Sequence, residues 1–387
     1  MATDPPSLRV LFATPAYWPA LSFGGPIWIA KELAEGLASN GHPVDVLTTT
    51  LLDIEAGRSV RGRVELLGGA RVHYLATPVR YRWFGLTPTL PLELTRLPKP
   101  DVAHVFGCRD PVGIAVAAWC RLRRIPYVLE PLGMFRPRVR KLRLKRALDP
   151  LLSRPGARGA SLIVAASELE LEDLADLGVP RERIAVRPYP FPPPRPGRTG
   201  KLRRQLGLDD DDPLVLYVGR IAAGKGIDLL LRAVRDLPGV HVALVGPRDH
   251  KDVAALADAA SAANGRVHVL PPSTDERPLA LYGDADVFVL PAESERENFG
   301  LVVAEAVAAG VPTVISERAG IAGLLGDSAA LVVRPEPAAI REGIDRLLRE
   351  EDLRERLRQG GFEVAAANST AAIVKRQEEL YRRTLAS

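Results

Sequence analysis

The stretch Pro291-Ala-Glu-Ser-Glu-Arg-Glu-Asn-Phe-Gly-Leu-Val-Val-Ala-Glu-Ala-Val-Ala-Ala-Gly310 decides how the chain around it can fold. Apolar runs over 286–290 and 311–315 flank it, and both are rich in β-branched residues, as is typical of buried strands. Between them, 299–309 is rich in Ala, Val and Leu and ends at Gly310, a pattern typical of a helix with its C-terminal stop. The stretch therefore predicts a strand–loop–helix–strand unit.

The loop of this unit carries carboxylates at the place where the helix starts. A helix N-terminus has free N–H groups and a partial positive charge, so it attracts phosphate. Glu297 lies just before the predicted helix and Glu305 two turns inside it, so one ligand along the loop can contact both. Carboxylates bind paired hydroxyls strongly, which suits a sugar nucleotide. By residue type alone, the alternative stays open that Glu297 caps the helix and Glu305 is a solvated surface residue.

Length and composition describe an ordinary globular protein. A chain of 387 residues is long enough for two α/β domains, and its 47% hydrophobic and 26% charged residues are unexceptional. The sequence shows neither a long uncharged apolar run nor a signal peptide, so we expect no transmembrane helix. The two cysteines, Cys108 and Cys120, are too few for a disulfide framework and fit a reducing, cytoplasmic location.

Predicted strands and helices alternate in both halves, which indicates α/β domains with doubly wound parallel sheets and ligand sites at the carboxyl ends of the strands. The expected strands are 8–14, 44–48, 72–75, 101–106, 126–130, 161–165, 214–218, 240–245, 267–270, 286–290 and 311–315. Residues 52–70 are expected to be loop and irregular structure. The expected C-terminal helices are 338–349, 352–360 and 362–384.

These patterns predict the domain organisation. We expect an N-terminal domain over 1–187, a Pro-rich linker over 188–200 and a C-terminal domain over 201–365. A last helix over 366–387 is expected to pack back on the first domain.

Two glycine-rich loops each join a predicted strand to a helix. Gly24-Gly25 permits close backbone approach to a ligand, although a plain turn explains it equally well. The loop over 219–226 adds Arg220 and Lys225, and two cations in such a loop suit a diphosphate. The pair Asp284 and Asp286 matches a metal-binding Asp-x-Asp pattern but stands at the start of a strand, so we interpret it as structural.

The segment 136–152 is the most basic part of the chain, with seven cations among leucines at helical spacing. One interpretation is a surface helix docked by its leucines, with the cations in water. The other is contact with an anionic membrane surface or an anionic acceptor, which would place the protein at the inner face of a membrane. Nucleic acid is not expected, because no aromatic residues are interleaved to stack on bases.

The segment Glu297-Asn-Phe-Gly-Leu-Val-Val-Ala-Glu305 resembles the Glu-x₇-Glu motif of the retaining glycosyltransferases of family 4. Its flanks, 285–291 and 305–312, match the family as well. The loop over 218–226 resembles the family's phosphate loop, and 24–26 its N-terminal glycine loop. The motifs occur in the family's order, and the resemblance spans nearly the whole chain.

The resemblance implies the GT-B fold, two Rossmann-like domains whose parallel sheets face each other across a cleft. It makes 1–187 the acceptor-side domain and 201–365 the nucleotide-sugar-binding domain. It also implies transfer of a sugar, with retained configuration, from a nucleotide-diphosphate sugar to a glycan or lipid-linked acceptor. Cell-surface polysaccharide or glycolipid synthesis is the expected setting.

The resemblance also assigns residues. Glu305 would hold the ribose hydroxyls and Glu297 those of the transferred sugar. Arg220 and Lys225 would stabilise the leaving diphosphate, so neither a metal nor another cofactor is expected. The remaining donor-binding residues that it implies are Gly25, Asn298, Phe299, Gly300 and Leu301.

The chain departs from the pattern of this family on the acceptor side. Phe106 and Leu132 occupy positions where many members carry histidine, so a histidine base is not expected, and the nearby Glu130 and Asp110 receive no role. The missing histidines are also compatible with a non-catalytic sugar-nucleotide-binding subunit. A GT-B epimerase or phosphorylase is a further alternative, against which the intact Glu-x₇-Glu motif argues.

Overall fold

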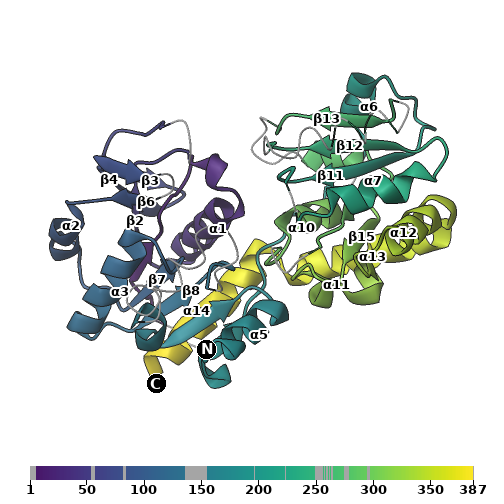
Figure 1. Cartoon of the computed structure of the whole chain (residues 1–387). Coiled ribbons are helices and arrows are strands. Elements are labelled where there is room, and N and C mark those ends of the chain that lie inside the picture. Colours follow the sequence, from purple (N-terminus) through teal and green to yellow (C-terminus); the bar gives the residue numbers. More distant parts are fainter. Residues whose placement is uncertain are drawn as a thin grey trace. The chain divides into compact units, whose positions relative to one another are not determined.

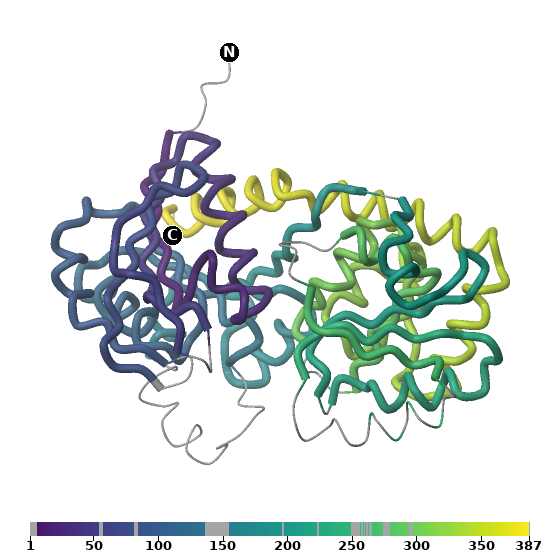
Figure 2. The backbone as a smooth tube through the Cα atoms, turned by 90° about the horizontal axis from the view of Figure 1, so that it is seen from above, coloured from purple at the N-terminus to yellow at the C-terminus, as the bar shows by residue number. Residues whose placement is uncertain are grey.

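The chain forms two compact units in the computed structural model (Figure 1). Unit 1 comprises Met1–Pro190 and Thr370–Ser387, and unit 2 comprises Phe191–Ser369, so the chain passes between the units twice (Figure 2). The structure describes residues 6–53, 57–81, 84–135, 155–195, 197–222, 224–248, 265–273, 279–293 and 297–386, with positions 256, 258, 260 and 262. The basic segment 136–152 lies outside the described residues, so its predicted role stays a prediction.

Unit 1 is built on an eight-stranded sheet in which every strand but β3 runs parallel to its neighbours. The strand order is β10 (Ile184–Val186), β9 (Leu162–Ala165), β8 (Tyr127–Glu130), β7 (Val102–Phe106), β1 (Val10–Ala13), β2 (Val44–Thr49), β4 (Ala70–Leu75) and β3 (Arg63–Leu67). The central strands are buried along their whole length, because a parallel sheet is covered on both faces.

Helices cover this sheet, and a small hairpin adds to unit 1. The helices are α1 (Gly25–Ser39), α2 (Leu90–Arg96), α3 (Pro111–Arg123), α5 (Glu168–Asp176), α14 (Thr370–Ala386) and the 3₁₀ turns η1 (Leu21–Phe23) and η2 (Arg181–Arg183). The hairpin consists of β5 (Val79–Tyr81) and β6 (Phe84–Leu86), which pair antiparallel. The last helix, α14, packs against α1 and β8 of unit 1.

A buried ionic network fixes α14 on the sheet of unit 1. His104 in β7 contacts Glu130 Oε2 through Nε2 at 3.1 Å and the Tyr381 hydroxyl of α14 through Nδ1 at 2.7 Å. Arg187 also pairs with Glu130. Burial lowers the pKa of His104. Although burial opposes ionisation of Glu130, Arg187 and His104 hold its pKa below the usual value. A buried charge persists only with partners, so Glu130 has a structural role here.

Unit 2 is built on a six-stranded parallel sheet. Its order is β13 (Val267–Leu270), β12 (His241–Val245), β11 (Leu214–Val218), β14 (Val287–Leu290), β15 (Thr313–Ser316) and β16 (Leu331–Val333). Its helices are α6 (Lys201–Leu206), α7 (Ile227–Arg235), α9 (Leu279–Gly283), α10 (Leu301–Ala308), α11 (Ala322–Ala329), α12 (Pro337–Arg349) and α13 (Glu351–Ala367). The predicted class of doubly wound α/β domains is therefore confirmed. Within the described residues, no helix combines the length and the apolar character that crossing a membrane requires.

The expectation of irregular structure over 52–70 is wrong at 63–67. Residues 63–67 form strand β3, which pairs antiparallel with β4. A two-residue turn at Gly68 and Gly69 joins the two strands, and both glycines have positive φ angles, of 51° and 85°. A Gly-Gly pair between two strands is a hairpin signal, and it was the clue in the sequence.

The predicted helix break near residue 361 is also wrong, because α13 continues through it to Ala367. A Cβ atom at Gly360 would lie 2.1 Å from the carbonyl oxygen of Ser328, and one at Gly361 would lie 2.9 Å from a methyl carbon of Val307. These glycines therefore allow close packing of α13 against its neighbours instead of ending the helix. The last helix begins at Thr370.

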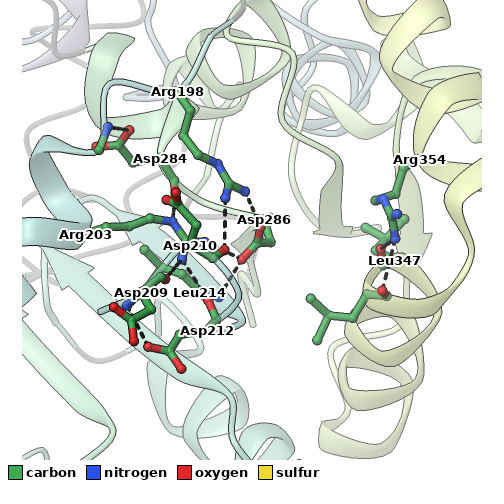
Figure 3. Close-up of polar contacts among 12 residues, drawn as sticks. Arg198, Arg203, Asp209, Asp210, Asp212, Leu214, Asp284, Asp286, Leu347 and Arg354 are labelled. Atoms are coloured by element: carbon green, nitrogen blue, oxygen red, sulfur yellow. Dashed lines mark hydrogen bonds and ion pairs between the residues drawn. The ribbon is translucent and has the colours of Figure 1, made fainter. Parts of the chain in front are cut away.

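The end of the Pro-rich stretch is bound to unit 2 through Asp284 (Figure 3). The Asp284 side chain is fully buried and accepts hydrogen bonds from the backbone N–H groups of Thr199, Gly200 and Leu202, each at 2.7 Å. These are N–H groups at the start of α6, so Asp284 satisfies donors that the helix itself leaves free.

Asp286 continues this arrangement at the start of β14. It pairs with Arg198, and it accepts from Arg203 at 2.7 Å and from the N–H of Leu214 at 2.8 Å. Both carboxylates therefore hold the chain together at the amino ends of the strands, which confirms the structural interpretation of this Asp-x-Asp pattern.

We predict that Asp284→Ala destabilises unit 2 by at least about 3 kcal/mol, because several charge-assisted hydrogen bonds are lost and buried N–H groups are left unsatisfied. The matched control is Asp211→Ala, which removes an exposed carboxylate and is expected to change stability by less than about 0.5 kcal/mol. Urea unfolding followed by circular dichroism compares the two. Identical unfolding midpoints would contradict the role given to Asp284.

Candidate active site

The strand order of unit 2 places a switch point between β11 and β14. The chain leaves β11 through α7 toward β12 on one side, whereas β14 lies on the other side of β11. In open α/β sheets, ligands bind in the crevice outside the carboxyl ends of two such strands. The loops that follow them, 219–226 and 291–300, are those that the sequence singled out.

The backbones of these two loops touch. Gly226 has a φ angle of +72°, and a Cβ atom there would lie 1.7 Å from the carbonyl oxygen of Pro291. Only glycine permits both this conformation and this approach. The first loop is further held by Ile221, whose N–H donates to the carbonyl of Pro247 at 2.8 Å.

The structure brings Lys225 and Glu297 together. Lys225 Nζ lies 2.8 Å from Glu297 Oε2, and the two side chains are 22% and 19% exposed. The contact joins the glycine-rich loop to the residues before α10 and leaves both groups accessible. Burial, together with the nearby Glu297 carboxylate, raises the pKa of Tyr217, so its hydroxyl stays protonated and donates to the carbonyl of Arg220 at 2.9 Å.

Arg220 is exposed, and its side chain forms no ion pair with any described residue. It therefore presents its guanidinium to solvent at the carboxyl end of β11. The loop over 219–226 thus carries one cation in an ion pair, Lys225, and one exposed cation, Arg220, without an ion-pair partner among the described residues.

Backbone hydrogen bonds from Gly320 and Ile321 hold the loop before α10 in place. The carbonyl of Glu297 accepts from the N–H of Gly320 at 3.0 Å, and the carbonyl of Phe299 accepts from Ile321 at 2.8 Å. The Phe299 ring is buried and contacts Phe191 edge to face, with 6.4 Å between ring centroids. These contacts set the position of Asn298 within the loop.

Gly300 is the N-cap of α10 and has a φ angle of +106°, and Leu301 is the first residue of the helix. Gly300 has no side chain that could cap this terminus, and the Glu297 carboxylate contacts Lys225 instead. The first N–H groups of a helix have no acceptor inside the helix, and α10 begins after the loop that follows the carboxyl end of β14.

Glu305 is half-buried on α10 and is fixed by Tyr282 of α9. The Tyr282 hydroxyl donates to Glu305 Oε2 at 2.6 Å. Burial and the nearby carboxylate raise the pKa of Tyr282, which keeps it a donor. Glu305 is therefore not a solvated surface residue. Sequence reasoning missed Tyr282. The signal in the sequence was a tyrosine within an apolar stretch, because the hydroxyl of a buried tyrosine needs a hydrogen-bond partner.

Gly25 lies in unit 1, where it is the first residue of α1 and follows Gly24, whose φ angle is +78°. It stands at the carboxyl end of β1, beside the switch point that unit 1 has between β1 and β7.

Phe106 and Leu132 are the positions of unit 1 where many members of the resembled family carry histidine. Phe106 is buried and stacks on His104, with 4.2 Å between ring centroids, so this position belongs to the core. Leu132 has a φ angle of +57°, which is unusual for a residue other than glycine. Asp110 caps α3 by accepting from the N–H of Gly113 at 2.7 Å, and burial raises the pKa of Asp110 to about 6.

A cavity of about 810 Å³ lies at the opposite, amino-end edge of the unit 2 sheet. Gly310 is among the residues that line it. Arg198, Asp286 and Arg354, which are labelled in Figure 3, line it as well. Because parallel sheets bind their ligands at the carboxyl ends of the strands, this cavity is not the candidate active site.

Comparison with known proteins matches each unit to a family. Residues 24–190 match the model of the glycosyl transferase 4-like domain, and residues 199–364 match that of glycosyl transferases group 1. A D-inositol 3-phosphate glycosyltransferase of Xylanimonas cellulosilytica is 36% identical over 216 residues, which span 51% of each chain. An uncharacterized glycosyltransferase of Methanocaldococcus jannaschii is 27% identical over 90% of this chain and 91% of its own.

Solved structures show the same fold. Sucrose-phosphate synthase from Thermosynechococcus elongatus superposes with a TM-score of 0.74 and 22% identity, over 98% of this chain and 99% of its own. Anabaena HepE, solved in complex with UDP-glucose, superposes with a TM-score of 0.73 and 18% identity, over 97% of this chain and 100% of its own. The chain therefore belongs to the glycosyltransferases with the GT-B fold, with a glycosyl transferase 4-like domain in unit 1 and a group 1 domain in unit 2.

Proposed function

We propose that the protein transfers a sugar from a nucleotide-diphosphate sugar to a hydroxyl acceptor, and that the carboxyl edge of unit 2 binds the donor. The observation that carries the proposal is the contact of 2.8 Å between Lys225 and Glu297. It places a cation for phosphate beside a carboxylate for sugar hydroxyls, next to the N-terminus of α10.

The donor has a defined place in this proposal. Glu305, held in place by the Tyr282 hydroxyl, accepts the ribose hydroxyls. Glu297 binds hydroxyls of the transferred sugar and releases Lys225 to the diphosphate. The remaining donor contacts come from Asn298, from the N–H groups of Phe299, Gly300 and Leu301, and from Gly25 of unit 1.

The chemistry follows from where charge develops. The bond between the anomeric carbon and the phosphate oxygen breaks, the acceptor oxygen forms the new bond to that carbon, and negative charge grows on the leaving diphosphate. Lys225 and Arg220 stabilise this charge more in the transition state than in the bound donor, which lowers the barrier. With two cations in these positions the reaction needs neither a metal nor another cofactor.

The anomeric configuration is retained in this proposal. The acceptor attacks from the face that the diphosphate leaves, and a phosphate oxygen takes the acceptor proton. Support comes from unit 1, where Phe106 stands in place of a histidine and has no basic group, and where the buried Glu130 is bound to Arg187, so neither acts as a base.

The acceptor class that we propose is a glycan or a lipid-linked sugar, as in cell-surface polysaccharide or glycolipid synthesis. We propose a cytoplasmic location, with contact to an anionic membrane surface through 136–152 supported by the charge of that segment.

Tyr282→Phe is expected to weaken binding of the nucleotide sugar about tenfold, because it removes the charge-assisted hydrogen bond that orients Glu305. The ring shape is unchanged, so the buried site stays filled. Tyr127→Phe is the matched control, since it removes a tyrosine hydroxyl of unit 1 that bonds the carbonyl of Gly156. Calorimetry compares the dissociation constants, and equal affinity in both variants would contradict the role of Tyr282.

Lys225→Ala is expected to lower kcat by about a hundredfold or more while changing the affinity for the nucleoside portion far less. Arg232→Ala removes an exposed cation of α7 outside the site and is expected to leave kcat unchanged. Steady-state kinetics with saturating donor separates the two. A Lys225→Ala enzyme with full turnover would exclude Lys225 from catalysis.

The proposed function as a whole is tested by incubating the protein with a panel of nucleotide sugars and hydroxyl acceptors in the presence of a chelator. We expect acceptor-dependent release of nucleoside diphosphate, and NMR of the product is expected to show the anomeric configuration of the donor. An inverted product would overturn the mechanism, strict dependence on added metal would overturn the role of the cations, and no transfer from any donor would overturn the function.

A further inference from the structure

Strand β3 (Arg63–Leu67) forms one edge of the eight-stranded sheet of unit 1. It pairs with β4 on one side, in an antiparallel register that runs from Arg63 opposite Tyr74 to Leu67 opposite Ala70. Within the part of the chain that the structure describes, no strand and no isolated bridge pairs with its other side. This outer edge therefore presents backbone N–H and C=O groups to which another strand can bind.

The outer edge of β3 lacks the features that usually protect a free edge. Proteins commonly use a proline, a lysine, a β-bulge or a very short strand for this purpose. The sequence of β3, Arg-Val-Glu-Leu-Leu, has five residues with neither proline nor lysine, and its register with β4 contains no bulge. Its two charges, on Arg63 and Glu65, are opposite in sign and lie 2.7 Å apart. We therefore expect a partner strand at this edge.

The side chains of β3 divide between a charged face and an apolar face, because they alternate along a strand. Arg63 and Glu65 lie on one face, where the Arg63 guanidinium carbon lies 5.0 Å from the centre of the Tyr74 ring. Val64 and Leu66 lie on the other face, and they are 58% and 71% exposed. Aliphatic side chains exposed to this extent on an unpaired edge favour association with another chain.

The sequence of β3 is complementary to itself. In an antiparallel pair, residues directly opposite each other lie on the same face of the sheet. When two copies of β3 pair around a two-fold axis at Val64, Arg63 of each copy lies opposite Glu65 of the other. The axis thus forms two ion pairs on one face. On the other face the two Val64 side chains meet, and each Leu66 lies diagonal to Val64 of the other copy.

Other positions of the axis are unfavourable. An axis at Glu65 would place the two Glu65 carboxylates opposite each other, and an axis at Arg63 would do the same with the two guanidinium groups. Like charges directly opposite each other destabilise a strand pair. The charges therefore select the register in which Val64 lies on the axis.

We propose that β3 is a dimerisation strand, through which two copies of the chain pair edge to edge with the two-fold axis at Val64. The two eight-stranded sheets of unit 1 then form one continuous sheet. The partner is a second copy because β3 is complementary to itself, and a two-fold interface is complete with two copies. This proposal does not depend on the proposed transfer reaction.

Charge reversal tests the partner and the register together. Arg63→Glu and Glu65→Arg each place like charges opposite in both pairs, so each variant alone is expected to dimerise at least about tenfold more weakly than the unmodified chain. When the two variants are mixed, the introduced glutamate lies opposite the introduced arginine. The mixture is therefore expected to form a heterodimer as strong as the unmodified dimer. Sedimentation velocity over a concentration series measures each association.

The matched control is Arg181→Glu, which breaks an exposed ion pair with Glu172 elsewhere in unit 1 and is expected to dimerise as the unmodified chain does. An unmodified chain that stays monomeric at every concentration would overturn the proposal and leave the edge to a strand of another protein. Unmodified chains that assemble beyond the dimer would also overturn it, as would two variants that fail to associate when mixed.

Leu66→Lys tests the apolar face separately. Leu66 is largely exposed in the single chain, so the circular dichroism spectrum is expected to stay unchanged. Dimerisation is expected to weaken at least about tenfold, because each copy brings an ammonium group beside the paired Val64 side chains. Leu122→Lys, which changes an 84% exposed leucine near the C-terminal end of α3, is the control and is expected to have no effect. Equal dimerisation of the two lysine variants would contradict the proposed interface.

Discussion

The candidate active site depends on the close approach of two backbones at the switch point of unit 2. Gly226 can lie against the carbonyl of Pro291 only because it lacks a side chain and adopts a positive φ angle. That approach brings the loop after β11 against the loop after β14, and Lys225 meets Glu297 as a result. A larger residue at 226 would separate the loops, and the cation and the carboxylate would no longer share one ligand.

Unit 1 is held together by a different constraint, a buried charge that needs its partners. Glu130 at the end of β8 is bound by His104 and Arg187, and His104 in turn bonds Tyr381 of the last helix. Since α14 follows the second crossing between the units, this network ties the C-terminal end of the chain to the sheet of unit 1. A different set of contacts therefore stabilises each unit. The residues proposed to act on the donor are concentrated in unit 2.

The sequence was informative wherever a pattern is local. The apolar runs predicted the central strands, and the glycines after β11 and the carboxylates after β14 marked the loops that meet. Patterns that depend on partners were misread. Residues 63–67 form the strand β3 because β4 pairs with them across the turn at Gly68 and Gly69. Gly360 and Gly361 look like the end of a helix in the sequence, whereas in the structure they let α13 pack closely on Ser328 and Val307. Tyr282 was missed for the same reason, because its contact with Glu305 spans two helices.

The central claim is that the carboxyl edge of unit 2 binds the nucleotide sugar. Hydrogen exchange measured with and without a nucleotide sugar tests it most directly, because it reports every backbone amide at once. The account predicts protection over 217–226 and 297–305, with little change over 347–358, which lines the cavity at the amino-end edge. Protection confined to 347–358, with unchanged exchange over 217–226 and 297–305, would contradict it.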